Sequence, residues 1–260
     1  MTVRAKKHLG QHFLKDKTVC DRIAKAIDES EYRFKKVLEI GPGMGALTEY
    51  LLNYDRFETH VIEIDTESVE YLNKHYSKLV GKVYEKDFLR TDLTNLMGPE
   101  PFVVAGNFPY NISTQILFKV LDYRDQIPLV VGMFQKEVAE RVAEPPGSKK
   151  YGIISVLLQA YYDIDYMFTV PPDVFIPPPK VDSGVIRLKR NNVKKLPCNE
   201  KLFKTVVKLA FNQRRKTLRN SLKSLIKERG IDNLSSNEIF TRRPESMSVE
   251  EFIQLTVLFE

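Results

Sequence analysis

The sequence contains no tryptophan, only two cysteines, and no apolar run near the length of a membrane span. Cys20 and Cys198 lie far apart without CxxC spacing, so we expect neither a disulfide framework nor a zinc site, as is typical of a reducing compartment. A membrane helix needs roughly 18 consecutive apolar residues, and the first eight residues, MTVRAKKH, also lack the apolar core of a secretory signal. We therefore predict a cytoplasmic protein without a membrane span.

Acidic residues are fewer than basic ones: 34 Asp and Glu against 40 Lys and Arg in 260 residues, for a net charge of +6. This mild basicity fits a polyanionic partner without establishing one. The hydrophobic fraction of 43% suffices for one large core with a small additional domain.

Apolar, strand-like segments alternate with segments of helical spacing in the first two thirds of the chain. Such alternation predicts a mostly parallel sheet covered by helices. The expected strands are Val37–Gly41, His60–Asp65, Lys82–Asp87, Phe102–Asn107 and Leu129–Phe134, followed by Asp163–Val170 and Gly184–Arg190 as a possible hairpin that ends the sheet. The expected helices are Ala46–Asn53, Glu67–Tyr76 and Ile153–Tyr161.

The last two expected strands are joined by residues 171–180, which contain five prolines. This segment cannot be a helix or a central strand, so it is either a rigid connector or a stiff loop that presents Phe175 to a site.

The chain changes character after Arg190. Asn191–Asn199 is polar and fits a linker, whereas Lys201–Arg229 has helical spacing and carries ten Lys or Arg and one acid. A final helix is expected to begin at Ser248, with Glu251 completing a capping box. We therefore divide the chain into a domain of residues 1–190 and a helical domain of residues 191–260.

A glycine turn, Gly41-Pro-Gly-Met-Gly45, closes the first strand. Its GxGxG pattern does not match the GxGxxG fingerprint of dinucleotide sites. Glu63, 22 residues after Gly41, stands where a carboxylate accepts ribose hydroxyls, although Asp65 shares its strand face and spacing alone does not choose between them. Asp87 ends the third strand and either reads an adenine amino group or caps the next helix. Acidic strand ends favour a cationic nucleoside, S-adenosylmethionine, over a pyrophosphate.

The run Asn107-Phe108-Pro109-Tyr110 ends the strand Phe102–Asn107. A side-chain amide, a proline and an aromatic ring at a strand end can hold a flat base that carries an exocyclic amine. Beside a nucleoside cofactor, this combination indicates methyl transfer to an amino group of a nucleic-acid base. Asn107 and the Phe108 backbone carbonyl would accept hydrogen bonds from the amine, while Tyr110 and Phe175 would cover the two faces of the base.

These motifs resemble, in order and over nearly the full chain, those of the KsgA family of ribosomal RNA adenine dimethyltransferases. The matching segments are Gly10–Leu14, Glu39–Gly45, Asn107–Tyr110, Phe175–Ser183 and Phe211–Asn220. The resemblance implies a seven-stranded, Rossmann-like class I methyltransferase sheet with a small helical domain. It also implies S-adenosylmethionine contacts, without a metal, from His12, Leu14, Gly41, Glu63, Asp87 and Asn107, beside Gly43 and Gly45 of the turn. His12 stands where many members have Asn, and Phe108 where they have Leu.

The resemblance implies dimethylation of two adjacent adenines near the 3′ end of small-subunit (16S) ribosomal RNA, with S-adenosylhomocysteine as the product. The partner would be the immature small subunit, bound by a monomer through phosphate contacts from Arg214, Arg215, Lys216 and Arg219. The alternatives are an Erm-type enzyme that methylates large-subunit (23S) RNA, an assembly factor that acts by binding, and a methyltransferase for small-molecule or DNA amines.

Overall fold

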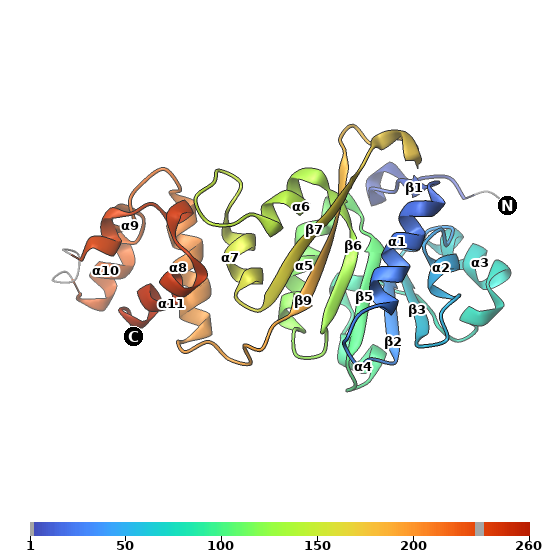
Figure 1. Ribbon diagram of the computed structural model, residues 1–260, viewed down its shortest axis with the longest axis horizontal. Coiled ribbons are helices and arrows are strands. Elements are labelled where there is room, and N and C mark those ends of the chain that lie inside the picture. The colour runs from blue at the N-terminus through green and yellow to red at the C-terminus, as the bar shows by residue number, and fades with distance from the viewer. Residues whose placement is uncertain (1–2, 232–236) are drawn as a thin grey trace. The chain divides into compact units, whose positions relative to one another are not determined.

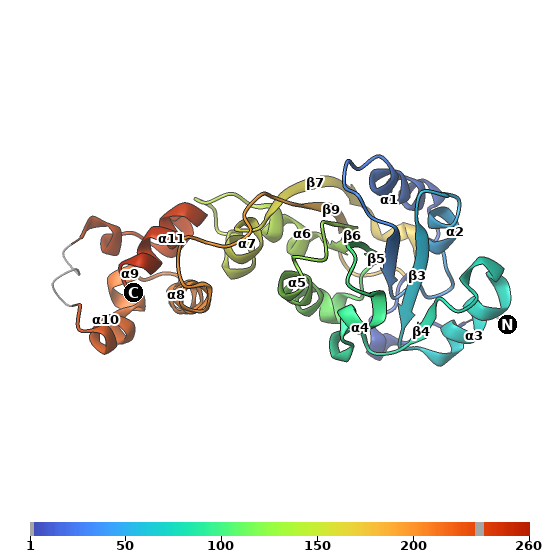
Figure 2. The same ribbon diagram turned by 90° about the horizontal axis from the view of Figure 1, so that it is seen from below.

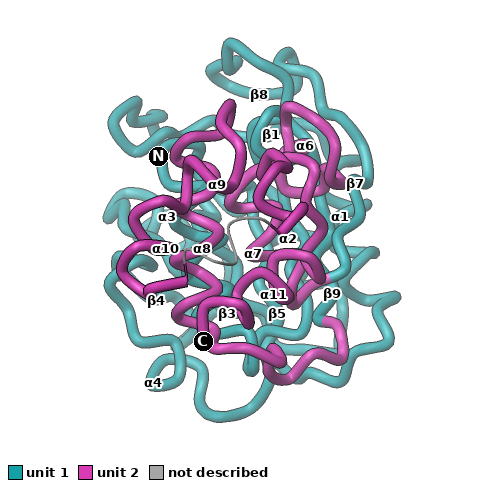
Figure 3. The backbone as a smooth tube through the Cα atoms, turned by 90° about the vertical axis from the view of Figure 1, so that its left-hand side faces the viewer, with its two compact units in different colours: residues 1–139, 163–190 teal, residues 140–162, 191–260 magenta. Residues whose placement is uncertain are grey.

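The structure is a computed structural model, and it describes residues 3–231 and 237–260. The chain divides into two compact units, which Figure 3 shows in different colours. The first contains residues 1–139 and 163–190, and the second contains residues 140–162 and 191–260. The domain division made from the sequence differs from these units in the segment 140–162.

A seven-stranded sheet forms the centre of the first unit (Figure 1). Its strand order is β4-β3-β2-β5-β6-β9-β7, in which the four pairs from β4 to β6 are parallel and β9 is antiparallel to β6. The predicted mostly parallel sheet is confirmed, and every predicted strand lies within two residues of its expected bounds. The strands are β2 (Lys36–Ile40), β3 (Glu58–Glu63), β4 (Val83–Glu85), β5 (Phe102–Asn107), β6 (Leu129–Gln135), β7 (Tyr162–Val170) and β9 (Ser183–Arg190).

Helices cover both faces of this sheet, with α1 and α2 on one face and α4 and α5 on the other (Figure 2). On the first face, Ile23 and Ile27 of α1 are fully buried in one apolar cluster with Val103 and Val131 of the central strands. None of the described helices is long and apolar enough to cross a membrane. The helices are α1 (Lys17–Asp28), α2 (Thr48–Leu51), α3 (Thr66–His75), α4 (Leu93–Met97), α5 (Ser113–Asp122) and α6 (Lys136–Ala143), which continues into the second unit.

Two distant parts of the first unit form a second, small sheet. β1 (Phe13–Leu14) pairs antiparallel with β8 (Phe175–Ile176), which places Leu14 opposite Phe175. The sequence analysis did not anticipate this pairing, although it selected both segments as motifs. The pairing joins the N-terminal motif to the proline-rich loop.

The described part of the second unit is helical, apart from its connecting segments. The final helix begins at Ser248 with the predicted capping box to Glu251. The predicted helical character of Lys201–Arg229 is confirmed, but the stretch forms several helices rather than one: α8 ends at Asn212, and residues 213–217 form a turn. The six polar residues 212–217 offer no side chain for the apolar face of a helix to bury. The helices are α7 (Ile153–Gln159), α8 (Glu200–Asn212), α9 (Leu218–Ser221), α10 (Lys223–Arg229) and α11 (Val249–Val257).

Candidate active site

A cavity of about 390 Å³ lies in the first unit at the carboxyl ends of β2, β3 and β5. Ligands of open α/β sheets bind at this edge, where loops from neighbouring parallel strands meet. Residues 9–14 form one wall of the cavity, so the N-terminal motif lies beside the glycine turn and the Asn-Phe-Pro-Tyr run. The predicted residues that line it are His12, Leu14, Gly41, Gly43, Glu63, Asp87, Asn107, Phe108, Pro109 and Tyr110.

The turn after β2 has a backbone conformation that glycine favours. Gly43 has a φ of +55° and Gly45 a φ of +84°, which residues with a Cβ rarely adopt. A Cβ on Gly43 would lie 2.7 Å from Cε1 of Phe13, which is in the opposite wall. Gly45 does not line the cavity, but Tyr76 does. A Cβ on Gly45 would lie 2.6 Å from the ring of Tyr76. Gly45 therefore acts on the cavity through the room it leaves for Tyr76.

The Glu63 carboxylate at the end of β3 is only 5% exposed and is held by backbone donors. Its oxygens accept hydrogen bonds from the N–H groups of Gly43 (3.1 Å), Ile64 (2.9 Å) and Asp65 (3.0 Å). Burial raises the pKa of Glu63 above its ordinary value, although these three donors act in the opposite direction. A carboxylate offers about four acceptor positions, so one remains for a ligand hydroxyl.

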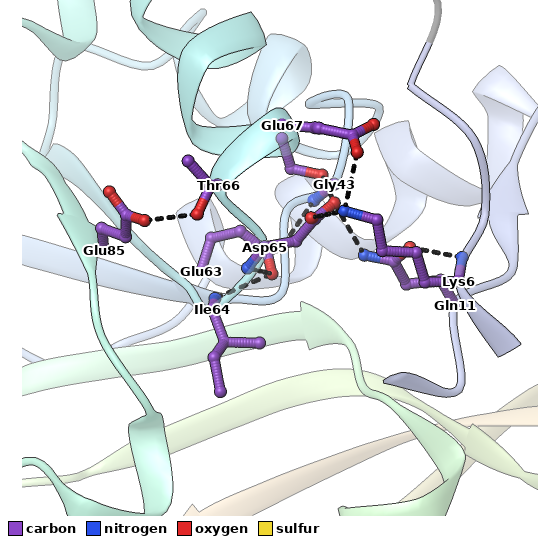
Figure 4. Close-up of polar contacts among 10 residues, drawn as sticks. Lys6, Gln11, Gly43, Glu63, Ile64, Asp65, Thr66, Glu67 and Glu85 are labelled. Carbon is purple, nitrogen blue, oxygen red and sulfur yellow. Dashed lines mark hydrogen bonds and ion pairs between the residues drawn. The ribbon is translucent and has the colours of Figure 1, made fainter. Parts of the chain in front are cut away.

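Asp65 shares the strand face of Glu63 but has different partners (Figure 4). Its carboxylate forms an ion pair with Lys6 and accepts hydrogen bonds from Gln11 (3.4 Å) and Ser68 (2.8 Å). Burial alone would raise the pKa of Asp65, but these three hydrogen bonds lower it overall. Asp65 does not line the cavity. The geometry therefore separates two carboxylates that spacing left equivalent, and only Glu63 faces a ligand site.

Asp87 caps the helix that follows it, as one interpretation of the sequence predicted, and it also lies at the cavity. Its Oδ1 accepts a hydrogen bond from the N–H of Leu89 (2.8 Å) and so caps the short 3₁₀ helix Phe88–Arg90. Asp87 also lines the cavity. In the described ranges, no group of three or more His, Cys, Asp or Glu side chains is arranged to hold a metal ion.

Glu39 is a cavity residue that the sequence analysis quoted within the glycine motif but did not select. It is 2% exposed, and its carboxyl accepts a hydrogen bond from the hydroxyl of Thr48 (2.6 Å). Burial raises the pKa of Glu39 to about 8, and the charge of Glu63 contributes in the same direction. The sequence does contain a signal for Glu39: it is an acid inside the apolar strand β2. Ionisable residues are rarely buried, and those that are buried are often functional.

Asn107 ends β5 with its side-chain amide in a defined orientation. Its Nδ2 donates a hydrogen bond to the backbone carbonyl of His12 (2.9 Å). Among the described residues, none donates to its Oδ1. The amide carbonyl at the cavity wall is therefore available to accept a hydrogen bond from a ligand.

Phe108 is fully buried, and its ring packs on the face of the sheet over Gly106 and Gly132. A Cβ on Gly132 would lie 2.2 Å from Cε2 of this ring, and one on Gly106 would lie 3.1 Å from Cε1. Gly106 and Gly132 are paired across β5 and β6, so two absent side chains make the slot that the ring fills. The ring of Phe108, which is larger than the Leu side chain of the family motif, thus fits in this slot, while the Phe108 backbone remains at the cavity.

His12 and Tyr110 lie together at the cavity, with ring centroids 5.3 Å apart. The Nδ1 of His12 is 2.8 Å from the carbonyl oxygen of Pro177. A carbonyl only accepts, so Nδ1 donates in this hydrogen bond. The Tyr110 hydroxyl is hydrogen-bonded to Ser183, and burial raises the pKa of the phenol. Both rings are thus tied to the segment that contains the proline-rich motif.

Phe175 does not occupy the position expected from the sequence. It is 1% exposed, belongs to the apolar cluster beneath β1 and β8, and does not line the cavity. Side chains alternate along a strand, so the neighbouring Ile176 points outward and is 56% exposed. The expectation that Phe175 covers a base is therefore wrong for this conformation. Phe13, opposite Ile176 in the ladder, lines the cavity instead, as do Phe88 and Phe108.

The four basic residues expected to bind phosphate lie in the second unit and differ from one another. Arg214, Arg215 and Lys216 are in the turn after α8 rather than on a helix, and Arg219 is in α9. Arg214 is paired within the protein: its Nε lies 3.0 Å from Oε2 of Glu245, and its Nη2 donates to the carbonyl of Ser148 (3.2 Å). Arg215, Lys216 and Arg219 are exposed.

Comparisons with known proteins agree with this geometry. The family model described as "Ribosomal RNA adenine dimethylase" matches residues 2–257. The "Ribosomal RNA small subunit methyltransferase A" of Cytophaga hutchinsonii is 59% identical over 98% of this chain and 96% of its own.

Two solved structures share the architecture. A dimethyladenosine transferase from Plasmodium falciparum has a TM-score of 0.79 and 25% identity, over 95% of this chain and 97% of its own. The 23S rRNA methyltransferase ErmE has a TM-score of 0.65 and 26% identity, over 93% of this chain and 98% of its own.

Proposed function

The chain belongs to the ribosomal RNA adenine dimethylase family, and we infer that it transfers methyl groups from S-adenosylmethionine to adenine amino groups of small-subunit ribosomal RNA. The activity is dimethylation of two adjacent adenines near the 3′ end of this RNA during biogenesis of the subunit. The observation that carries this proposal is the cavity that joins Glu63, the glycine turn and Asn107 at one sheet edge.

An Erm-type activity on large-subunit RNA is the nearest rival. The fold alone does not discriminate, because ErmE shares it over nearly its whole length. Sequence identity favours the small-subunit substrate: 59% with a small-subunit methyltransferase against 26% with ErmE. An assembly role through binding is compatible with the proposed activity, since both require the immature subunit as partner.

The residues of the cavity fit S-adenosylmethionine, which supplies an electrophilic methyl group on a sulfonium when it is bound. Glu63 has an acceptor position for a ribose hydroxyl, and Gly41 and Gly43 let a ligand approach the backbone closely. Glu63 and Asp87 give the lining an acidic character, which suits a cationic cofactor.

Asn107 and Phe108 orient the amine of the target base. The adenine amine is a weak nucleophile because its lone pair is delocalised into the ring. We assign to the Asn107 Oδ1 and the Phe108 backbone carbonyl the acceptance of its two hydrogens, which favours a pyramidal nitrogen with an available lone pair. The hydrogen bond from Asn107 Nδ2 to the His12 carbonyl keeps Oδ1 in this role. Positioning supplies most of the acceleration, and the surplus proton leaves to water.

Tyr110 stacks on the flipped base, and Pro109 sets the turn that presents it. The exposed cations Arg215, Lys216 and Arg219 contact RNA phosphates in this proposal. Arg214 has a different role, because its guanidinium is already engaged by Glu245 and Ser148.

The proposal is tested by transfer of labelled methyl groups to undermethylated small subunits and, separately, to protein-free large-subunit RNA. We expect labelling of two adjacent adenines in the small subunit. Asn107→Ala should lower turnover by about 100-fold or more, the usual cost of losing a preorganised transition-state hydrogen bond, while the protein still folds and binds S-adenosylhomocysteine. Asn111→Ala is the matched control, because Asn111 Nδ2 also donates to a backbone carbonyl of the N-terminal segment, that of His8 (3.3 Å).

If both variants lose activity equally, Asn107 acts by holding the N-terminal segment rather than by orienting the amine. Labelling of large-subunit RNA alone would replace the proposal with an Erm-type activity. Binding of subunits without any labelling would leave only the assembly role.

A further inference from the structure

The N-terminal wall, defined as residues 7–14 with residues 9–14 lining the cavity, is attached to the end of β3 by a side-chain cluster that the catalytic proposal does not use. Lys6 stands immediately before this wall, and its Nζ pairs with Asp65 and, at 3.0 Å, with Glu67. Figure 4 shows Lys6 and Gln11 reaching from the N-terminal segment toward Asp65. The cluster therefore connects the beginning of the wall to the strand that carries Glu63.

Residues 6–11 form a turn that is closed by hydrogen bonds within it. The Lys6 N–H donates to Oε1 of Gln11 (2.9 Å), and the Lys6 carbonyl accepts from Leu9 (3.0 Å). Gln11 in turn donates through Nε2 to Asp65 (3.4 Å). Asp65 thus holds both ends of a compact turn, and that turn leads directly into the cavity residues His12, Phe13 and Leu14.

Asp65 has the burial of a structural anchor. Its side chain is 1% exposed, whereas the side chains of Lys6 and Glu67 are 29% and 57% exposed. A buried carboxylate needs a charged partner and hydrogen bonds, which here come from Lys6, Gln11 and Ser68. The exposed Glu67 contributes little by comparison, because solvent and salt screen its pair with Lys6.

We propose that Asp65, together with Lys6 and Gln11, positions the N-terminal wall against the cavity and so controls retention of the cofactor. These are positioning residues: none of them is assigned a contact with the reacting atoms. The wall is also attached by hydrogen bonds from Asn107 to the His12 carbonyl, from Asn111 to the His8 carbonyl and from His12 to the Pro177 carbonyl, and by the pairing of β1 with β8. Loss of the Asp65 contacts leaves these in place, so the wall becomes open more often rather than permanently.

Opening the wall weakens cofactor binding in proportion to the fraction of molecules that are binding-competent. Asp65→Asn keeps the shape of the side chain and leaves the backbone N–H that donates to Glu63, but removes the charge that pairs with Lys6. We expect the Kd for S-adenosylhomocysteine and the KM for S-adenosylmethionine to rise by about tenfold, the effect of losing one hydrogen bond to a charged group. Turnover at saturating cofactor should stay within about twofold, because the closed state itself is unchanged.

The inference rests on the proposed function only for the identity of the cofactor, and its test needs no RNA. Calorimetry with S-adenosylhomocysteine would compare the wild type with Asp65→Asn, Lys6→Met, Lys6→Arg and Glu67→Gln. Lys6→Met acts on the more exposed partner and should reproduce the weaker binding even if Asp65→Asn disturbs folding. Lys6→Arg retains the ion pair and should restore affinity, and Glu67→Gln should match the wild type.

Amide hydrogen exchange is a second measurement, and it distinguishes local opening of the wall from a general loss of stability. Residues 7–14 should exchange faster in Lys6→Met, while amides of β2 and β5 keep their protection. Unchanged affinity in both Asp65→Asn and Lys6→Met, or lower turnover with unchanged KM, would overturn the inference alone. A wild-type protein that does not bind S-adenosylhomocysteine would overturn the proposed function and this inference together.

Discussion

Separate substitutions of Arg214 and Arg215 distinguish two roles of the basic motif, a contact within the protein and binding of RNA. The two residues are adjacent in the turn after α8, yet Arg214 pairs with Glu245 and Ser148 while Arg215 is exposed. We expect Arg214→Ala to destabilise the protein and Arg215→Ala to weaken RNA binding, each without the other's effect.

The magnitudes follow from the contacts. A hydrogen bond to a charged group contributes about 1.5–3 kcal/mol when it is protected from solvent. The side chains of Arg214 and Glu245 are 35% and 27% exposed, so solvent screening reduces this value. Arg214→Ala should therefore lower the free energy of unfolding by about 1–2 kcal/mol, which corresponds to a decrease in Tm of roughly 2–6 °C for a chain of this size.

Arg215→Ala should leave Tm unchanged and lower RNA affinity. If it removes one phosphate contact, the slope of log K against log salt becomes less steep by about 0.7–0.9. The measurements are thermal unfolding of each variant and RNA binding across a salt series. A wild-type Tm for Arg214→Ala, with a reduced salt slope, would refute the assignment of Arg214 to a contact within the protein and return it to the RNA-binding set.

Two further predictions concern the cavity. Burial raises the pKa of Glu39 to about 8, so folded molecules hold a proton that unfolded molecules release near pH 4.5. The contribution of Glu39 to the free energy of unfolding is therefore full below pH 4.5 and is lost as pH rises towards 8. Glu39→Gln should flatten that decline, by up to about 1.4 kcal/mol per pH unit, in urea unfolding series; an unchanged pH profile would contradict a protonated Glu39. Gly132→Ala would place a Cβ 2.2 Å from the Phe108 ring, so we expect lower turnover and a loss of about 1–3 kcal/mol in stability, whereas an unchanged Tm would show that the slot has spare room.

The elements that could be predicted are those whose signal is local. The strands of the large sheet carry apolar residues within a few positions of one another, such as Val103–Ala105 in β5 and Leu129–Val131 in β6, and the Ser248–Glu251 capping box is a pattern over four positions. The two-residue strands β1 and β8 carry no such signal, because two residues have no period and their pairing joins positions more than 160 apart in the chain. The site motifs were found for the same local reason, but the contacts between motifs were not.

The orientation of a motif residue is decided by packing across distant segments, and Phe175 illustrates this. A proline-rich loop beside a site presents either Phe175 or Ile176, since neighbouring strand residues face opposite sides. Nothing within the loop chooses between them. The choice follows from the ladder with β1, where Leu14 and Phe175 join the apolar cluster that also contains Val19 and Ile23.

The sequence likewise does not tell which charged residues of a motif are engaged within the protein. Asp65 and Glu63 are indistinguishable by spacing, and Arg214 and Arg215 by type, yet in each pair one residue is engaged by the protein and the other is available to a ligand. A charge in a motif indicates that a charged partner is needed and leaves open whether that partner is a ligand or another part of the chain. Burial alone does not decide, because Glu63 is also only 5% exposed. The neighbouring groups decide: Asp65 has a cation and side-chain donors within the fold, whereas Glu63 has backbone N–H donors and the cavity. The cation of Asp65 is Lys6, and that pairing makes the N-terminal segment part of the cofactor site.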